Sequence, residues 1–166
     1  MITTPAPAAK KHDDFQVLWV FGAISQALRQ QIVAFWLQEG ALTNADEAWR
    51  RSWEVACVLQ EAESGRIAGV CTVAIRLDDQ DMSYGYFRIF IRPASRLVGL
   101  NYRLMKMMIE GFEVLAREPG APHRLLATIE NRKLERRASQ KFIARLGFTS
   151  VGRTVDGEWV IHRPLR

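Results

Sequence analysis

A buried strand that turns sharply into a long amphipathic helix constrains this chain more than any other feature. Residues 84–91 read Tyr-Gly-Tyr-Phe-Arg-Ile-Phe-Ile, an aromatic and β-branched run that is typical of a buried strand. Pro93 cannot donate to a sheet ladder and ends the strand. Apolar residues then recur at steps of three and four, which places them on one face of a helix: Leu97, Leu100, Leu104, Met108, Phe112 and Leu115.

The junction between this strand and this helix is suited to hold an anion. Gly99 has no side chain, so a ligand can approach the bare backbone beside the first helical turn. The start of a helix carries unpaired N–H groups and the positive end of the peptide dipoles. The sequence therefore predicts an anion site here, with phosphate as the best candidate.

Strands and helices alternate along the rest of the chain. The pattern predicts strands at residues 15–20, 53–60, 67–77 and 124–129, and a closing hairpin from residues 148–152 and 158–162 around Asp156-Gly157. A helix is expected over residues 23–39, and Asn44 with Glu47 resembles a capping box that starts a second, short helix. A further helix is marked by Leu134, Ala138, Phe142 and Leu146. Because a helix joins strands 84–91 and 124–129, these two strands can be parallel.

Charge and cysteine content narrow the function classes. A net charge of +5 and a pI near 9.6 suit a polyphosphate ligand or nucleic acid equally well. Nucleic acid is the weaker candidate, because no repeated aromatic pattern accompanies the basic stretch at residues 132–145. Cys57 and Cys71 form no metal-ligand cluster and no disulfide framework, so both are expected to be buried in adjacent strands. No metal site is expected, since His12, His123 and His162 show no ligand spacing.

The chain is expected to be a cytoplasmic protein with one domain. Its longest apolar run, residues 17–24, falls far short of the ~18 residues that suggest a membrane span. Lys10-Lys11 before that run imitates a signal peptide, but Asp13 and Asp14 interrupt it. Residues 1–12 are predicted to be a flexible tail, and residues 13–166 a single domain. A homodimer is left open.

Two motifs resemble those of the GNAT superfamily of N-acyltransferases. Arg96-Leu97-Val98-Gly99-Leu100-Asn101 is similar to the pyrophosphate-binding motif Arg/Gln-x-x-Gly-x-Gly/Ala, with Asn101 where a small residue is usual. Arg145-Leu146-Gly147-Phe148 resembles the second motif, a helix that ends in Lys/Arg-x-Gly-Phe. The order of elements agrees over residues 15–164. The resemblance implies a mixed α/β, GNAT-type fold: a mostly antiparallel six- to seven-stranded sheet, a parallel central pair splayed apart, and about four flanking helices.

The resemblance also implies a reaction and a cosubstrate. Acyl-coenzyme A, most simply acetyl-coenzyme A, would lie where the parallel pair diverges, and an amine would attack its thioester directly in a ternary complex without a metal. The implied cosubstrate-binding residues are Phe90, Ile91, Arg96, Leu97, Val98, Gly99, Leu100, Asn101 and Asn131. The amine acceptor and the length of the acyl chain are not defined by any motif.

Two catalytic positions depart from the family pattern. Many members have a Tyr four residues before the Gly of the second motif, where this chain has Ile143; Ser139 is the nearest substitute, unless it simply faces solvent. Some members have a Glu in the fourth strand, where this chain has Gly85. The proton acceptor stays open among Tyr84, Tyr86, Glu130 and a water chain, with Tyr86 as the catalytic candidate. A catalytically silent acyl-coenzyme A binding domain is the alternative function.

Acceptor-site candidates come from the strand and from the first two helices. Arg88 lies in a strand expected to be covered on both faces, so it must meet an acidic side chain or an anionic ligand such as a carboxylate-bearing amine. Trp36 and Trp49, on the two helices, are candidate walls of the acceptor site. A solvated helix face or a contact with the 3′-phosphate of the ligand would explain the basic residues Arg132, Lys133, Arg136, Arg137, Lys141 and Arg145.

Overall fold

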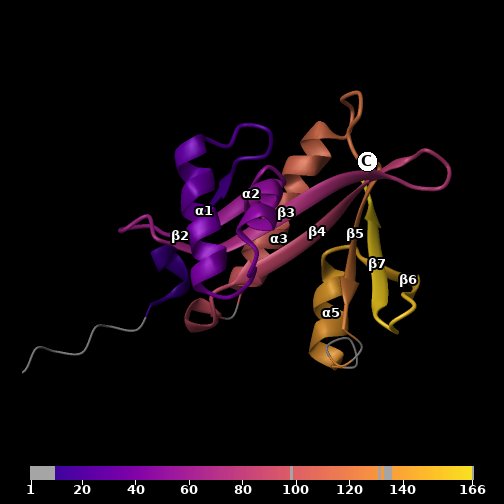
Figure 1. The fold of residues 1–166 in the computed structure, drawn as a ribbon. Helices are drawn as coiled ribbons and strands as arrows, with labels where there is room; N and C mark the ends of the chain where they lie inside the picture. The colour runs from indigo at the N-terminus through magenta and orange to yellow at the C-terminus, as the bar shows by residue number, and fades with distance from the viewer. Residues whose placement is uncertain (1–9, 98, 131, 133–135, 166) are drawn as a thin grey trace, which may run out of the picture.

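A mixed β-sheet forms the centre of the protein (Figure 1). The computed structural model describes residues 10–97, 99–130, 132 and 136–165. Within these residues the sheet has seven strands in the order β1-β2-β3-β4-β5-β7-β6, and every neighbouring pair is antiparallel except β4 and β5. The strands are Phe15–Trp19 (β1), Val55–Glu61 (β2), Ile67–Leu77 (β3), Ser83–Ile91 (β4), Arg124–Ile129 (β5), Thr149–Arg153 (β6) and Trp159–Pro164 (β7).

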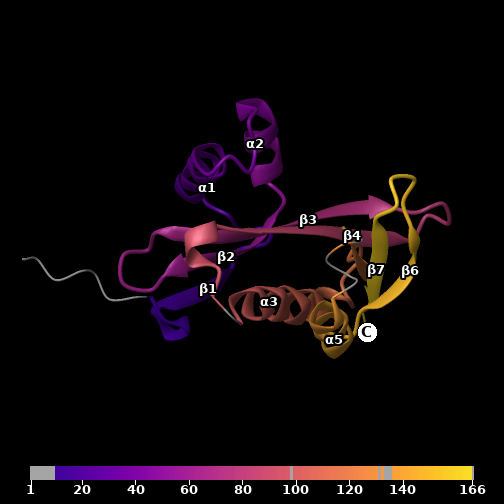
Figure 2. The same ribbon diagram turned by 90° about the horizontal axis from the view of Figure 1, so that it is seen from below.

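Helices cover the two faces of this sheet. In the described part of the chain they are Gln26–Gln38 (α1), Ala45–Ser52 (α2), Leu100–Leu115 (α3) and Arg137–Arg145 (α5). Figure 2 shows α1 and α2 on one face, with α3 and α5 on the other. Two 3-10 turns, His12–Asp14 and Pro93–Ser95, precede β1 and α3. The expected GNAT-type fold, with a parallel pair inside a mostly antiparallel sheet, is confirmed.

Each face of the sheet carries its own hydrophobic core. On the α3 face, the predicted helix stripe is buried, with Leu100, Leu104, Met108 and Phe112 fully inaccessible to solvent. On the opposite face, α1 packs on β2 and β3 through Ile32, Val33, Phe35 and Trp36. Both cores pack against β2 and β3 from opposite faces, and this burial stabilises the middle of the sheet.

Local hydrogen bonds shift some predicted boundaries. α1 begins at Gln26 instead of residue 23, because the Ser25 hydroxyl accepts the Leu28 N–H at 3.1 Å and caps the helix. The Asn44 cap of α2 is confirmed, with its side chain accepting the Glu47 N–H at 3.0 Å. Trp53, predicted to start β2, instead ends α2 and is 64% exposed.

Some predictions concern residues that the structure does not describe. Leu134, predicted on the face of α5, is one of these, as are residues 1–9 of the predicted tail. The last residues of that tail are described, and Lys10 forms an ion pair with Glu61 at 3.8 Å. In the described part of the chain, no helix is long and apolar enough to cross a membrane.

Cys57 and Cys71 are buried neighbours on adjacent strands, as predicted. They are paired in the register of β2 and β3, both are fully inaccessible, and both are free thiols. Burial raises the pKa of the Cys57 thiol to about 12 and the pKa of Cys71 well above its usual value, since a thiolate is poorly solvated there.

We therefore expect the native protein to be inert toward a chromogenic disulfide reagent at about pH 8. With a pKa near 12, only about one Cys57 thiol in ten thousand is ionised at that pH, and the thiolate is the reactive form. In denaturant, the same assay should report 2 thiols per chain. Rapid labelling of the folded protein would contradict this burial.

A second prediction concerns the contact between α3 and β1. A Cβ placed on Gly111 would lie 2.1 Å from the Trp19 ring, so Gly111→Ala should overpack this contact. The clash should outweigh the ~1 kcal/mol that Ala gains over Gly in a helix, and we expect a net loss of about 1–3 kcal/mol in the free energy of unfolding. Val114→Ala, at a position of the same helix that is 81% exposed, is the matched control. Denaturant melts of both variants measure the difference, and an unchanged midpoint for Gly111→Ala would refute it.

Candidate functional site

The parallel strands β4 and β5 separate soon after they meet. Their register contains two pairs, Gly85 with Leu125 and Tyr86 with Leu126. Beyond Tyr86, β4 continues to pair with β3, and β5 continues to pair with β7. A gap therefore opens between two strands that are each held by their outer neighbour.

One backbone edge of β4 faces this gap. The Arg92 N–H donates to the Ala68 carbonyl at 2.7 Å, which extends the β3–β4 ladder by one residue. Because alternate residues of an antiparallel ladder point both backbone groups at the same neighbour, the backbone groups of Phe90 face β3, and those of Ile89 and Ile91 face the gap. Of the two predicted residues, Ile91 faces the gap and Phe90 does not, and Ile89 faces the gap as well. That this edge binds a cosubstrate stays a prediction.

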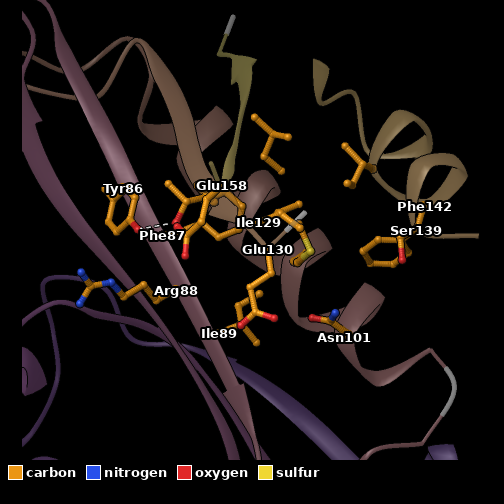
Figure 3. A pocket seen from close by; sticks show the side chains of 15 residues that line it. Tyr86, Phe87, Arg88, Ile89, Asn101, Ile129, Glu130, Ser139, Phe142 and Glu158 are labelled. Atoms are coloured by element: carbon orange, nitrogen blue, oxygen red, sulfur yellow. Dashed lines mark hydrogen bonds between the residues drawn. The ribbon is translucent and has the colours of Figure 1, made fainter. Parts of the chain in front are cut away.

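A cavity of about 480 Å³ occupies the gap (Figure 3). We call it the β4–β5 cavity. Its walls come from β4, β5, α3, α5 and the start of β7, and they mix apolar and polar side chains. The lining residues are Tyr86, Phe87, Arg88, Ile89, Asn101, Met105, Ala127, Thr128, Ile129, Glu130, Ser139, Phe142, Ile143, Glu158 and Ile161.

The start of α3 borders the same cavity through Asn101. Gly99 is the N-cap residue, with φ of 91°, a left-handed conformation that favours glycine. Its carbonyl accepts the Arg103 N–H at 3.0 Å, which is the first hydrogen bond of the helix, and the Leu100 N–H donates to the Leu97 carbonyl at 3.3 Å. The other amides of the first turn need partners outside the helix. In the described residues no side chain caps this end. The His12 imidazole lies 3.2 Å from where a Cβ on Gly99 would stand, so a larger residue there would meet it.

Basic side chains of α5 lie beside the start of α3. The Arg145 guanidinium lies over the Tyr102 ring, 5.5 Å from its centroid, and Tyr102 contacts Phe142 edge-on at 6.2 Å. The helix further exposes Arg137 and Lys141. Positive charge and the open end of α3 therefore meet at one place, which suits a ligand with several phosphates.

Several polar side chains meet inside the β4–β5 cavity. The Tyr86 hydroxyl lies 3.0 Å from Thr128 Oγ1, which links β4 to β5 across the gap. Glu130 and Glu158 also line the cavity, and the pairing of Ile129 with Trp159 places them opposite each other just past the end of the β5–β7 ladder. Sequence reasoning missed Glu158, although it closes the predicted last hairpin, because its position depends on this register.

The two positions that depart from the family pattern are explained by packing. A Cβ on Gly85 would lie 2.8 Å from Val73 Cγ1 and 3.1 Å from Leu125 Cδ2, so this strand position has no room for a carboxylate. Ile143 is buried in the core of the α3 face and lines the β4–β5 cavity. Ser139, one turn earlier, is half-buried and lines the cavity together with Tyr86, and the catalytic role of both residues stays a prediction.

The acceptor-site candidates divide into two groups. Arg88 was expected to be buried, but it is exposed on the face that carries α1 and α2, because an open cavity lies between it and these helices. Its guanidinium lies over the Tyr86 ring, 5.1 Å from the centroid. Trp36 and Arg88 line a second, smaller cavity together. Trp49 lies elsewhere, since its ring and its carbonyl contact Arg29.

The remaining predicted residues are placed as follows. Arg96 donates from Nε to the Ile91 carbonyl at 2.9 Å, and Leu97 packs at the edge of the α3 core. Val98 and Asn131 lie outside the described residues.

In the described ranges no group of three or more His, Cys, Asp or Glu could hold a metal ion. Burial, and secondarily the charge of Arg124, lower the pKa of His162 on β7, and that side chain does not line the β4–β5 cavity.

Comparison with known proteins gives a structural result only. No family model matches the sequence, and no curated protein is similar to it. Solved structures that match include a GNAT-family acetyltransferase from Streptococcus pneumoniae, with a TM-score of 0.65 and 15% identity over 92% of this chain and 99% of that chain. A ribosomal-protein-S5-alanine acetyltransferase from Vibrio fischeri matches with a TM-score of 0.66 and 14% identity, over 95% and 97%. The NatC complex bound to Gag peptide and CoA matches with a TM-score of 0.66 and 12% identity, over 92% and 99%. The chain thus shares the fold of GNAT acetyltransferases.

Proposed function

We propose that this protein is an N-acyltransferase that moves an acyl group, in the simplest case acetyl, from acyl-coenzyme A to a primary amine. The observation that supports this most strongly is the gap between β4 and β5, which holds a cavity of about 480 Å³ and borders the uncapped start of α3. Acyl-coenzyme A matches such a site, because its thioester arm could enter the cavity and its diphosphate could lie at the start of α3. The acceptor is then an amine on a small molecule or a peptide.

Acyl-coenzyme A would be held largely by backbone groups. Its diphosphate would accept hydrogen bonds from amides of the first turn of α3, beside Gly99 and Arg96. The pantetheine arm would pair with the edge of β4 that faces the gap, at Ile89 and at the N–H of Ile91, since the Ile91 carbonyl already accepts a hydrogen bond from Arg96. The 3′-phosphate would lie near the basic residues of α5. The first two contacts use backbone groups that lie outside the hydrogen-bond pattern of α3 and of the sheet, and the third uses exposed positive charge.

The reaction would proceed by direct attack. The amine nitrogen forms a bond to the thioester carbonyl carbon, and the resulting oxyanion accepts a hydrogen bond from a β4 amide that faces the gap. The C–S bond then breaks, and coenzyme A leaves as a thiolate or, with a proton from Tyr86 or Ser139, as a thiol. The amine must lose a proton, which in this proposal goes to Glu158 or Glu130, the two carboxylates that line the cavity. A thiol of pKa ~8.5 leaves readily, so the absence of the usual Tyr at Ile143 is tolerable.

A second candidate function is a domain that binds acyl-coenzyme A without turnover. The packing around Gly85 favours it, because the strand position of the usual carboxylate cannot hold one here. A thiol-release assay on a panel of amines separates the two functions. Turnover of any amine supports the enzyme, whereas tight binding with no turnover across the panel supports the silent domain.

Binding of coenzyme A should depend on the bare backbone at Gly99. Gly99→Val would place a branched side chain beside His12 and the first amides of α3, and we expect the Kd for acetyl-coenzyme A to rise at least about tenfold. Gly120→Val is the matched control, because Gly120 has a similar φ of 80° but lies in the loop after α3 with no atom nearby. Both variants carry the cost of a left-handed Val, so only the difference between them reports the site. If titration calorimetry gives Gly99→Val and Gly120→Val the same affinity for acetyl-coenzyme A, the start of α3 does not bind this ligand.

Catalysis should depend on the half-buried carboxylate of Glu158. A general base contributes about 100- to 10,000-fold, so Glu158→Gln should lower kcat by about a hundredfold with the affinity for acetyl-coenzyme A unchanged. Glu63→Gln, at an exposed position of the β2–β3 turn, is the control. Rates of thiol release measure the effect. If Glu130→Gln loses activity and Glu158→Gln does not, the role of base moves to Glu130.

A further inference from the structure

A second cavity of about 190 Å³ adjoins the β4–β5 cavity on the face that carries α1 and α2. We call it the arginine cavity. It shares Arg88 and Ile89 with the larger cavity, so the two meet at β4. Its other walls come from α1, the loop between α1 and α2, α2, β3 and β4, and they are mostly apolar: Trp36, Ala41, Leu42, Arg51, Val70, Thr72 and Phe90. The only charged groups among these described lining residues are the two guanidinium groups, which carry the same sign.

Arg51 reaches this cavity from the last turn of α2 with one donor unused. Its side chain is 19% exposed, and its Nη2 donates to Glu47 at 3.0 Å. Its Nε is buried and has no hydrogen-bond partner among the residues that the structure describes. A buried N–H of a charged group is costly when it has no acceptor. A ligand with an acceptor atom could remove this cost at Arg51.

Arg88 supplies a second positive charge from β4. In Figure 3 its guanidinium points away from Ser139 and Asn101, across β4 to the side opposite these two residues. It lies over the Tyr86 ring at 5.1 Å from the centroid, and no ion pair joins it to another residue that the structure describes. Its charge is therefore available to a ligand that enters from this side.

Neighbouring carboxylates leave the cavity positive. Glu47 is shared between Arg50 and Arg51, and Arg50 also pairs with Glu54 at 3.3 Å. These four side chains are neutral as a group, so Arg88 remains as the uncompensated charge. Two guanidinium groups, one with a free buried donor, are the arrangement that favours a carboxylate.

We infer that the arginine cavity binds a carboxylate of the acceptor, so that the substrate is a small amino acid or a related amine that bears a carboxylate. This inference rests on the proposed acyl transfer. The carboxylate would lie between Arg51 and Arg88, the carbon chain would contact Trp36 and Phe90, and the amine would reach past Ile89 into the β4–β5 cavity. A cavity of about 190 Å³ suits a short chain and excludes a bulky one.

The test is a set of amines in matched pairs. A series of amino acids from glycine to aminohexanoate, together with aspartate and glutamate, is assayed for thiol release beside the carboxamide of each. We expect at least one carboxylate to have a KM at least about tenfold lower than that of its carboxamide, the effect of about one charge-assisted hydrogen bond. Equal KM values across all pairs would overturn the inference while leaving acyl transfer intact.

Two variant pairs locate the effect. Arg51→Met and Arg88→Met keep an apolar stem and remove the charge, and each should reduce the preference for the carboxylate about tenfold. Arg50→Met and Arg76→Met are the controls. Arg50 is the exposed neighbour of Arg51 on α2. Arg76 lies over the same Tyr86 ring as Arg88, and each guanidinium is 5.1 Å from the ring centroid. Neither control residue lines the arginine cavity. A preference that survives in both Arg51→Met and Arg88→Met would refute this site.

A binding measurement keeps the inference testable without turnover. Calorimetric titration of the same pairs into the protein alone, and into the protein saturated with coenzyme A, should show the carboxylate preference and its loss in Arg51→Met and Arg88→Met. If acyl-coenzyme A does not bind but this preference persists, the proposed function fails and the carboxylate site stands. If no pair shows a preference in either the kinetic or the calorimetric assay, the carboxylate site fails.

Discussion

The divergence of β4 from β5 is the constraint on which the rest of this structure depends. The two strands meet closely at Gly85, where the absence of a side chain leaves room for Leu125 and Val73, and they separate after Tyr86. Had the ladder continued, the amides of Ile89 and Ile91 would be used within the sheet, as in an ordinary parallel pair. The separation leaves the N–H groups of Ile89 and Ile91 outside the sheet ladder, while the Ile91 carbonyl accepts a hydrogen bond from Arg96. A ligand can supply the acceptors that a continued ladder would have supplied.

Two hydrophobic cores keep the gap open by holding each strand from its outer side. β4 is fixed by its long ladder with β3, by the contact of Phe90 with Phe35 on one face and by the contact of Phe87 with Phe148 on the other. β5 is fixed by a six-residue register with β7. The hydrogen bond between the Tyr86 hydroxyl and Thr128 Oγ1 links the two strands where they begin to diverge. A gap held in this way is preorganised, so a ligand need not separate the strands when it binds.

Periodicity predicted the elements well because burial is regular within them. The stripe from Leu100 to Phe112 and the alternation in β4 follow directly from helical and strand periods, and the turn at Gly99 follows from backbone freedom. The site was harder to predict, because it depends on contacts between elements. Arg88 was expected to be buried, since the sequence does not show the cavity between it and α1 and α2. Glu158 was missed because only the β5–β7 register brings it to the cavity.

The two halves of the proposed site would place different demands on the sequence. A donor site built from amides of α3 and β4 needs glycine only at the few positions where a side chain would block the ligand. Elsewhere it tolerates many side chains, because nearly every residue type carries the same backbone N–H. An acceptor site built from Arg51 and Arg88 depends on two particular side chains, one from α2 and one from β4. Strong constraints on the acceptor therefore lie in elements without a recognisable motif, and the choice of substrate can change while the donor site and the fold persist.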